Sequence, residues 1–202
     1  SMCQKIQSIN IPPSVSYIGN LAFKGCASFI EINVPSSVEF LGGNVFDGCE
    51  KCKISEEMTS IPSYMFDGCI LLKEVILHDN ITYIGKKAFR NCSSLADINL
   101  ANKISSLGEA AFEGCTSLKN IEIPENITSI EKSTFMGCES LVDIVLPNDV
   151  ERIGKFAFYK CINLKTIEIQ QNVETIDSSA FGECPLEKID IPFSVNNIGN
   201  NA

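Results

Sequence analysis

Cysteine is the residue of this 202-residue chain that most needs a chemical explanation: it occurs ten times, beside a single histidine. Thiolates are nucleophiles, and four converging thiolates or imidazoles form a zinc site. Eight cysteines each follow a phenylalanine by three positions, namely Cys26, Cys49, Cys69, Cys92, Cys115, Cys138, Cys161 and Cys184. Neighbours in this series are 23 residues apart, except for Cys49 and Cys69, which are 20 apart, and Cys3 precedes Cys26 by 23. A constant step stacks side chains in a column and does not gather them around one point, so we expect buried, reduced cysteines and no metal site.

Two further features could support catalysis, and neither has partner residues in the sequence. Cys49 and Cys52 form a Cys-x-x-Cys spacing with no second pair, so they are the pair to examine for a disulfide. The single histidine, His78, occupies a position where other repeats have proline, and no repeated nucleophile accompanies it. We therefore expect His78 to be a solvated turn residue. The glycines fit no phosphate-binding loop, so the sequence predicts no enzyme and no cofactor.

The repeated unit that positions these residues reads A-F-x-G-C-x-x-L-x-x-I-x-I-P-x-x-V-x-x-I-G-x-x. Its I-x-I pair, such as Ile121 and Ile123, has the period of two residues that is typical of a strand. The proline that often follows ends the strand, and the glycine allows a tight turn before a short helical or 3₁₀ segment that carries the phenylalanine inward. One strand cannot bury its own apolar face, so the units must stack into a parallel sheet.

This pattern closely resembles the BspA-like, or Treponema pallidum-type, class of leucine-rich repeats over nearly all of the chain. The resemblance implies that the I-x-I strands line a concave face and that the Phe/Cys segments form the convex side. Members are typically surface or secreted proteins of bacteria and parasitic protists that adhere to host or matrix proteins, and the family implies no catalytic residues. We therefore expect one α/β leucine-rich-repeat solenoid over residues 1–202, with about nine 23-residue repeats, a curved parallel β-sheet on the concave face and short helical or 3₁₀ turns on the convex face.

The repeat is irregular in two places. Between Cys49 and Cys69 three residues are missing and Pro62 replaces the turn glycine, so we expect a kink or a frayed strand there. The last unit is one residue short near Leu186, which predicts a distorted terminal repeat. The first and last repeats are incomplete, and apolar positions such as Ile9 and Ile198 would then lie open at the two ends. Either flanking repeats of a longer protein cover them, or two copies associate end to end.

The residues between the inward positions of each strand form outward columns, which are the informative part of the surface. They predict a protein-binding face made of Glu31, Glu74, Ile76, Asp97, Asn99, Asn120, Glu122, Asp143, Val145 and Glu168. Stacked like charges repel, so the acidic character of these columns costs some stability.

Three explanations of the acidic columns remain open. They could keep an open sheet soluble, or bind a basic protein segment with Ile76 and Val145 as apolar contacts. A divalent cation held by Asp97, Glu122 and Asp143 is a third option, although the loop geometry of calcium sites is absent.

The charge and the hydropathy of the chain restrict the classes of partner that it can bind and the places where it can be located. The net charge of −9 and the absence of a lysine run argue against nucleic acid. No apolar run approaches the ~20 residues of a membrane span, and no signal pattern opens the chain. Three sequons, at Asn80, Asn91 and Asn126, could carry glycans on a eukaryotic secretory route.

The sequence therefore favours a non-enzymatic protein-binding module of a cell-surface or secreted, adhesin-like protein that contacts host or matrix proteins through the concave face. The alternative is an intracellular, cytoplasmic scaffold that binds an endogenous protein. The identity of the protein ligand stays open.

Overall fold

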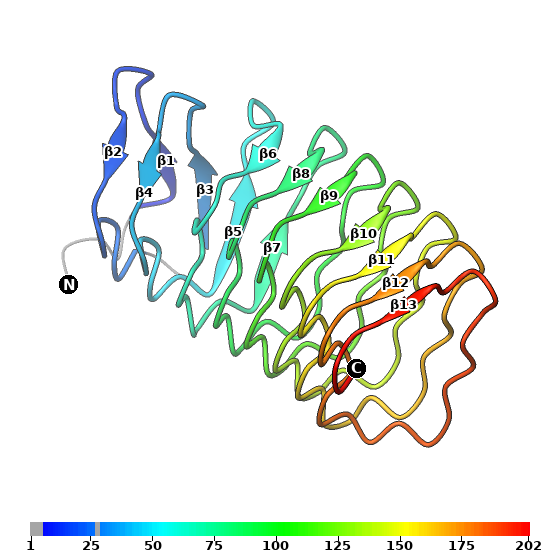
Figure 1. Cartoon of the computed structure of the whole chain (residues 1–202). Coiled ribbons are helices and arrows are strands. Elements are labelled where there is room, and N and C mark those ends of the chain that lie inside the picture. Colours follow the sequence, from blue (N-terminus) through cyan, green and yellow to red (C-terminus); the bar gives the residue numbers. More distant parts are fainter. Residues whose placement is uncertain (1–5, 27–28) are drawn as a thin grey trace.

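The protein winds into a parallel β-solenoid of about eight turns in a computed structural model that describes residues 6–26 and 29–202 (Figure 1). Each coil contributes up to two short strands, so two rows of strands run along the array. The first row is built from the I-x-I segments β1 (Ser8–Asn10), β3 (Phe29–Asn33), β5 (Lys51–Ile54) and β7 (Glu74–Ile76). These four strands pair in that order, all parallel.

Beyond β7 the I-x-I row continues without regular strands. Among the described residues after β7, this row is paired only by two isolated bridges, one between Asp97 and Asn120 and one between Val145 and Glu168. The expected alternation of burial still holds, because Ile121 is buried and its neighbour Glu122 is exposed. The prediction of a strand in every repeat was therefore right for the direction of the side chains and wrong for the continuity of the sheet.

The second row consists of two-residue strands, most of which run side by side in Figure 1. They are β2 (Tyr17–Ile18), β4 (Phe40–Leu41), β6 (Ser60–Ile61), β8 (Tyr83–Ile84), β9 (Ser106–Leu107), β10 (Ser129–Ile130), β11 (Arg152–Ile153), β12 (Thr175–Ile176) and β13 (Asn197–Ile198). They form three parallel sheets, β2-β4, β6-β8-β9 and β10-β11-β12-β13. In most of these strands the second residue is buried, so this row closes the core on a second side.

The segments that carry phenylalanine inward are turns, and no described residue lies in a helix, so the expected helical or 3₁₀ pieces are a wrong prediction. In the coil around Ala110, the N–H groups of Ala110 and Phe112 donate to Lys132 and Thr134 of the next coil, each at 2.9 Å. The intervening Ala111 N–H bonds locally. A helix would need all of these groups for its own ladder.

The backbone conformation of these turns also excludes a helix. Each turn has a residue with a positive φ near its start, which interrupts the right-handed conformation that a helix requires. These residues are Leu21, Asn44, Tyr64, Lys87, Ala110, Ser133, Phe156, Ser179 and Asn201. Alternate N–H groups of the turn therefore donate hydrogen bonds to the neighbouring coil, which adds a third hydrogen-bonded ladder to the two rows of strands.

The core contains a column of phenylalanine rings and a column of cysteines, beside the inward-pointing isoleucine, leucine and valine side chains. The rings of Phe89, Phe112 and Phe135 are fully buried and stack with centroids 5.3 and 5.7 Å apart and planes within 4°. The thiol of Cys115 donates to the carbonyl of Phe89 at 3.1 Å, and the thiol of Cys138 donates to that of Phe112 at 3.3 Å. Cysteine fits this position because it is small and apolar and still satisfies a buried carbonyl.

The I-x-I strand of the shortened repeat does not fray, so this part of the sequence-based expectation is wrong. Strand β5 pairs with both β3 and β7, with Glu31 beside Lys53 and Lys53 beside Ile76. From Glu31 to Ile76 is 45 residues, whereas from Cys26 to Cys69 is 43, so the strands slip by two residues relative to the cysteine column. A slip of two preserves the inward and outward faces, because side chains alternate with a period of two.

A break appears instead in the second row, between β4 and β6, which are not paired; this row is interrupted once more between β9 and β10. In most coils of this row the turn residue donates its N–H to the preceding coil, as Gly42 does to Ile18 at 2.9 Å and Gly85 to Ile61 at 2.8 Å. Pro62 stands at this position in the short repeat and has no N–H. The missing donor explains why the row breaks here.

Candidate protein-binding face

The outward side chains of the I-x-I segments form a surface that we call the I-x-I face. All ten residues predicted for binding point outward from it: Glu31 is half-buried and the other nine are exposed. Ile76 and Val145 are apolar and exposed by 37% and 73%, respectively. The register differs from the predicted columns, however, because the two-residue slip places Glu31 in line with Lys53 and Ile76 and not with Glu74.

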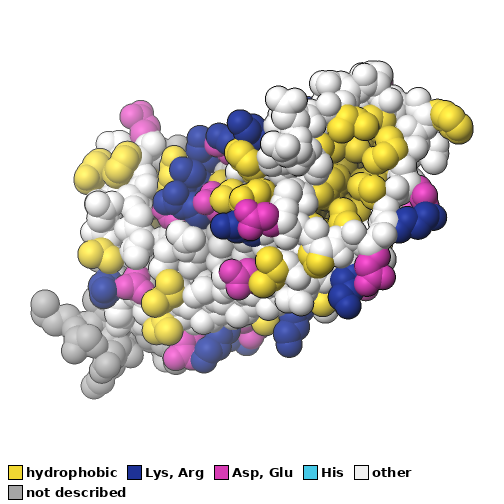
Figure 2. Space-filling view, turned by 60° about the horizontal axis from the view of Figure 1, so that its bottom comes forward, with side chains coloured by type: hydrophobic (Ala, Val, Ile, Leu, Met, Phe, Trp, Pro, Cys, Tyr) yellow, Lys and Arg dark blue, Asp and Glu magenta, His cyan; other side chains and the backbone are white. Residues whose placement is uncertain are grey.

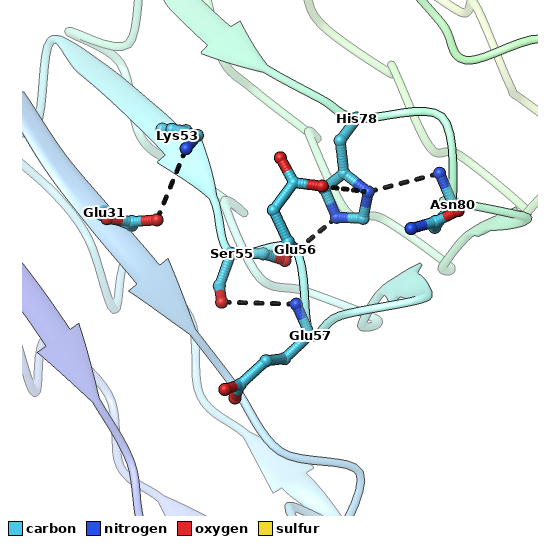
Figure 3. A network of polar contacts seen from close by, with 7 residues as sticks. All are labelled: Glu31, Lys53, Ser55, Glu56, Glu57, His78 and Asn80. Carbon is cyan, nitrogen blue, oxygen red and sulfur yellow. Dashed lines mark hydrogen bonds and ion pairs between the residues drawn. The ribbon is translucent and has the colours of Figure 1, made fainter.

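The N-terminal part of the face neutralises its own charge. Glu31 lies 3.6 Å from Lys53 on the next coil (Figure 3), and Glu74 lies 2.7 Å from Lys51 on the coil before it. Alternating charges across the coils attract, so these side chains stabilise the pairing of β3, β5 and β7. Glu31 and Glu74 are therefore already occupied by partners within the chain.

The C-terminal part of the face has no such compensation. Within residues 6–26 and 29–202, the carboxylates of Asp97, Glu122, Asp143 and Glu168 form no ion pair with lysine or arginine, although other ion pairs occur on these coils. The unpaired carboxylates and the reduction of the ladder to isolated bridges occur on the same coils. Neutral residues separate these carboxylates within each column, as the bridges of Asp97 with Asn120 and of Val145 with Glu168 show.

Two hollows open on this acidic part of the face. The larger, of about 760 Å³, is lined by segments 143–145, 166–171 and 188–193, and the smaller, of about 570 Å³, by segments 100–102, 120–125 and 143–147. Figure 2 shows hydrophobic side chains gathered in a hollow at the end of the array away from the grey N-terminal residues. A third hollow, of about 780 Å³, lies over the proline-rich loops of the first three coils.

Two exposed apolar residues of the larger hollow escaped the sequence-based prediction. Ile191 is 44% exposed and Phe193 is fully exposed. Phe193 directly follows Pro192, at a position where other repeats have a polar residue such as Glu125 or Asn148. A phenylalanine in a column of mostly polar residues was the available signal.

His78 is not the solvated residue that the sequence suggested. Its side chain is only 10% exposed, and its Nε2 lies 3.0 Å from the carbonyl oxygen of Ser55 on the preceding coil (Figure 3). The Asn80 N–H donates to Nδ1 at 3.2 Å, so a neutral ring with its proton on Nε2 satisfies both contacts. Glu56 lies 3.4 Å from Nδ1. The ring fills the place of the usual proline and joins two coils.

Eight of the nine described cysteines are buried, which confirms the predicted burial; Cys3 lies outside the described residues. Burial raises the pKa of Cys115 to about 12, so its thiol stays protonated at neutral pH. At the Cys-x-x-Cys spacing, a hydrogen bond with Cys52 lowers the pKa of Cys49, and burial raises that of Cys52. Across the described residues, no three His, Cys, Asp or Glu side chains are placed to hold a metal ion.

The three sequon asparagines are exposed as expected. The side-chain amide of Asn126 donates to the carbonyl of Asn102 at 2.7 Å, so this residue also joins two coils. None of the described segments is a helix long and apolar enough to cross a membrane.

The repeat geometry agrees with the sequence family that the chain matches, which is the BspA type Leucine rich repeat region, in six copies over residues 1–112 and 82–202. The chain belongs to the BspA-type leucine-rich repeat family. No curated protein sequence matches it.

Solved structures share the fold of this BspA-type protein. A leucine-rich repeat protein from Bacteroides ovatus is 29% identical with a TM-score of 0.66, over 96% of this chain and 57% of that one. A leucine-rich repeat protein from Eubacterium ventriosum is 21% identical with a TM-score of 0.64, over 96% and 63%. The pneumococcal vaccine antigen PcpA is 24% identical with a TM-score of 0.56, over 96% and 58%. The chain thus spans only about 60% of the length of these proteins.

Proposed function

We propose that this BspA-type repeat region is a non-enzymatic protein-binding module and that its I-x-I face is the contact surface. The observation that carries the proposal is the C-terminal part of that face, where apolar side chains and unpaired carboxylates border two hollows. Exposed apolar groups beside polar ones are typical of interaction sites. The alternation of ion pairs in the N-terminal part supports a structural role for that part.

We place the module on a cell-surface or secreted protein, as an adhesin-like contact for host or matrix proteins. One protein that shares its fold, PcpA, is a pneumococcal vaccine antigen, which supports an exposed location. The alternative is an intracellular scaffold for an endogenous partner. Protease treatment of intact source cells, followed by an antibody to this region, separates the two: loss of the signal without lysis supports the exposed location, and a protected signal refutes it.

The contact face is tested by charge reversal against a matched control. The variant E122K/E168K changes two carboxylates of the I-x-I face, and E113K/E139K makes the same change in net charge on the turn side of the coils. Binding to a panel of immobilised matrix proteins is measured by surface plasmon resonance. We expect E122K/E168K to lose binding and E113K/E139K to retain it. Equal binding by both variants would refute the I-x-I face as the contact surface.

A further inference from the structure

The larger hollow and its rim suggest what kind of protein segment the face takes. Its floor and rim include Ile167, Ile169 and the exposed Val145 and Phe193, so an apolar side chain of a partner finds apolar neighbours there. We propose that this part of the face binds an extended protein segment in which two basic side chains flank an apolar one. The proposal rests on the protein-binding function above and specifies the chemistry of the partner.

Charge selects a cationic partner. The smaller hollow is lined by Glu122, Glu125 and Asp143 and by no lysine or arginine. The larger one is lined by three carboxylates and one cation, Lys188, which is already paired at 2.7 Å with Asp190. The net charge of −9 reinforces this field. Nucleic acids and anionic lipid surfaces would be repelled, and a basic segment would be attracted.

The carboxylates are spread along the array, which fits a peptide better than a single ion. Val145 is bridged to Glu168 on the next coil, and Glu122 precedes Val145 by one repeat of 23 residues. The two glutamates are therefore two coils apart, or roughly 10 Å at the usual strand spacing of about 4.8 Å. A metal ion needs ligands within about 2.5 Å of one point, whereas these groups can each pair with a separate cation.

The same spacing sets the order of residues in the partner. A segment in the extended polyproline II conformation rises about 3.1 Å per residue with three residues per turn, so side chains three positions apart point to the same side and lie roughly 9 Å apart. Two basic residues at positions i and i+3 then reach Glu122 and Glu168, and an apolar residue between them lies beside Val145.

The test uses three fluorescein-labelled peptides of nine residues and the intact chain. The first, SGKVLKSGS, has the predicted spacing; the second, SGKKVLSGS, has the same composition with adjacent lysines; the third, SGEVLESGS, reverses the charge. Fluorescence anisotropy is measured at 50 mM and 500 mM NaCl. We expect the first peptide to bind at least threefold more tightly than the second, the third not to bind, and the affinity to fall at high salt. Equal binding of the first two peptides would overturn the proposed spacing.

Variants locate the peptide on the face. E122Q and E168Q should each weaken the first peptide about two- to fivefold, as expected for exposed ion pairs, and V145S should weaken it further. E31Q and E74Q are matched controls, because Lys53 and Lys51 already engage those carboxylates. Unchanged binding by E168Q and V145S would overturn the site. If a matrix protein binds through the I-x-I face and SGKVLKSGS does not bind, the basic-segment proposal fails and the protein-binding function stands. If E122K/E168K retains the matrix protein, both fail.

Discussion

Replacing Gly108 by alanine tests whether close contact between coils is what the repeat glycines provide. A Cβ at Gly108 would lie 2.5 Å from the backbone nitrogen of Lys86 and 2.7 Å from the carbonyl carbon of Gly85. Ordinary contact begins near 3.4 Å, so the coils would have to separate by almost 1 Å. They are joined at the same point by the Gly108 N–H, which donates to Ile84 at 2.8 Å. Overpacking costs about 1–3 kcal/mol and the weakened hydrogen bond about 1 kcal/mol, so we expect a loss of about 2–4 kcal/mol.

Gly19 is the matched control, because it occupies the same repeat position in the first described coil. A Cβ there meets only the ring of Tyr17, at 3.5 Å. G19A should therefore leave the free energy of unfolding unchanged or raise it by about 0.5 kcal/mol through the entropy of the unfolded chain. Urea unfolding followed by circular dichroism gives both values, and hydrogen exchange at the Gly108 amide reports the local opening. If G108A and G19A agree within about 0.5 kcal/mol, close packing is not the reason for this glycine.

Three further changes probe the core and the turns. F112A should lower the free energy of unfolding by about 3–5 kcal/mol, because the ring is fully buried between two others. F193A removes an exposed ring and should change the free energy of unfolding by less than about 0.5 kcal/mol. Urea unfolding measures both values. Burial raises the pKa of Cys115 from 9.0 to about 12, so the folded state keeps this proton to a higher pH than the unfolded state does. The contribution of the protonated thiol to stability is therefore complete below pH 9 and is lost as the pH rises from 9 to 12. Thermal melting of the parent and of C115A over this pH range measures the loss. R90K should cost about 1–2 kcal/mol, because Arg90 donates two hydrogen bonds, of 2.8 and 2.7 Å, to the almost buried Asp67 and lysine cannot reproduce this pair.

Each of these three expectations has an outcome that contradicts it. A loss below about 1 kcal/mol for F112A would mean that the ring column contributes little beyond filling space. Parallel melting curves of the parent and C115A between pH 9 and 12 would show that this thiol is not protected by the fold. A neutral R90K would reduce the Asp67 contact to an ordinary surface ion pair.

The period of 23 residues is sufficient to predict the stacked coils, because it fixes which side chains share a column and therefore which are buried. It does not predict how each turn is made. A segment such as Glu109–Cys115 contains good helix formers, and local propensity favours a helix. Its backbone instead bonds to the next coil, which is a tertiary interaction that local propensity does not contain. For the same reason, His78 is taken for a surface residue until the Ser55 carbonyl of the preceding coil is known to face it.

The outward direction of the candidate binding residues could be predicted from the sequence, whereas the full set of residues around the two hollows could not. Alternation within each I-x-I segment identifies the outward side chains, including Glu122 and Val145. It cannot identify which of them are free, because this depends on register: only the two-residue slip shows that Glu31 faces Lys53. The hollow near Phe193 depends on the spacing between coils, which no single-repeat pattern contains.

The division between stable and open parts of the array follows from where each coil obtains its hydrogen bonds. In the C-terminal coils, the turn around Phe112 and the β10 to β13 sheet bond each coil to the next, and the ring and cysteine columns fill the space between them. These contacts do not involve the I-x-I face. The face can therefore carry unpaired carboxylates such as Glu122 and lose its regular ladder while the coils stay in register. In the N-terminal coils the second row is broken beside Pro62, and there the I-x-I strands are fully paired and their charges alternate. The I-x-I strands thus span the break at Pro62, and between β9 and β10, where neither row has a pair of strands, the turn and the isolated bridge of Asp97 with Asn120 join the coils. The C-terminal part of the I-x-I face contributes least to holding the coils together, and it is the part that we propose for binding.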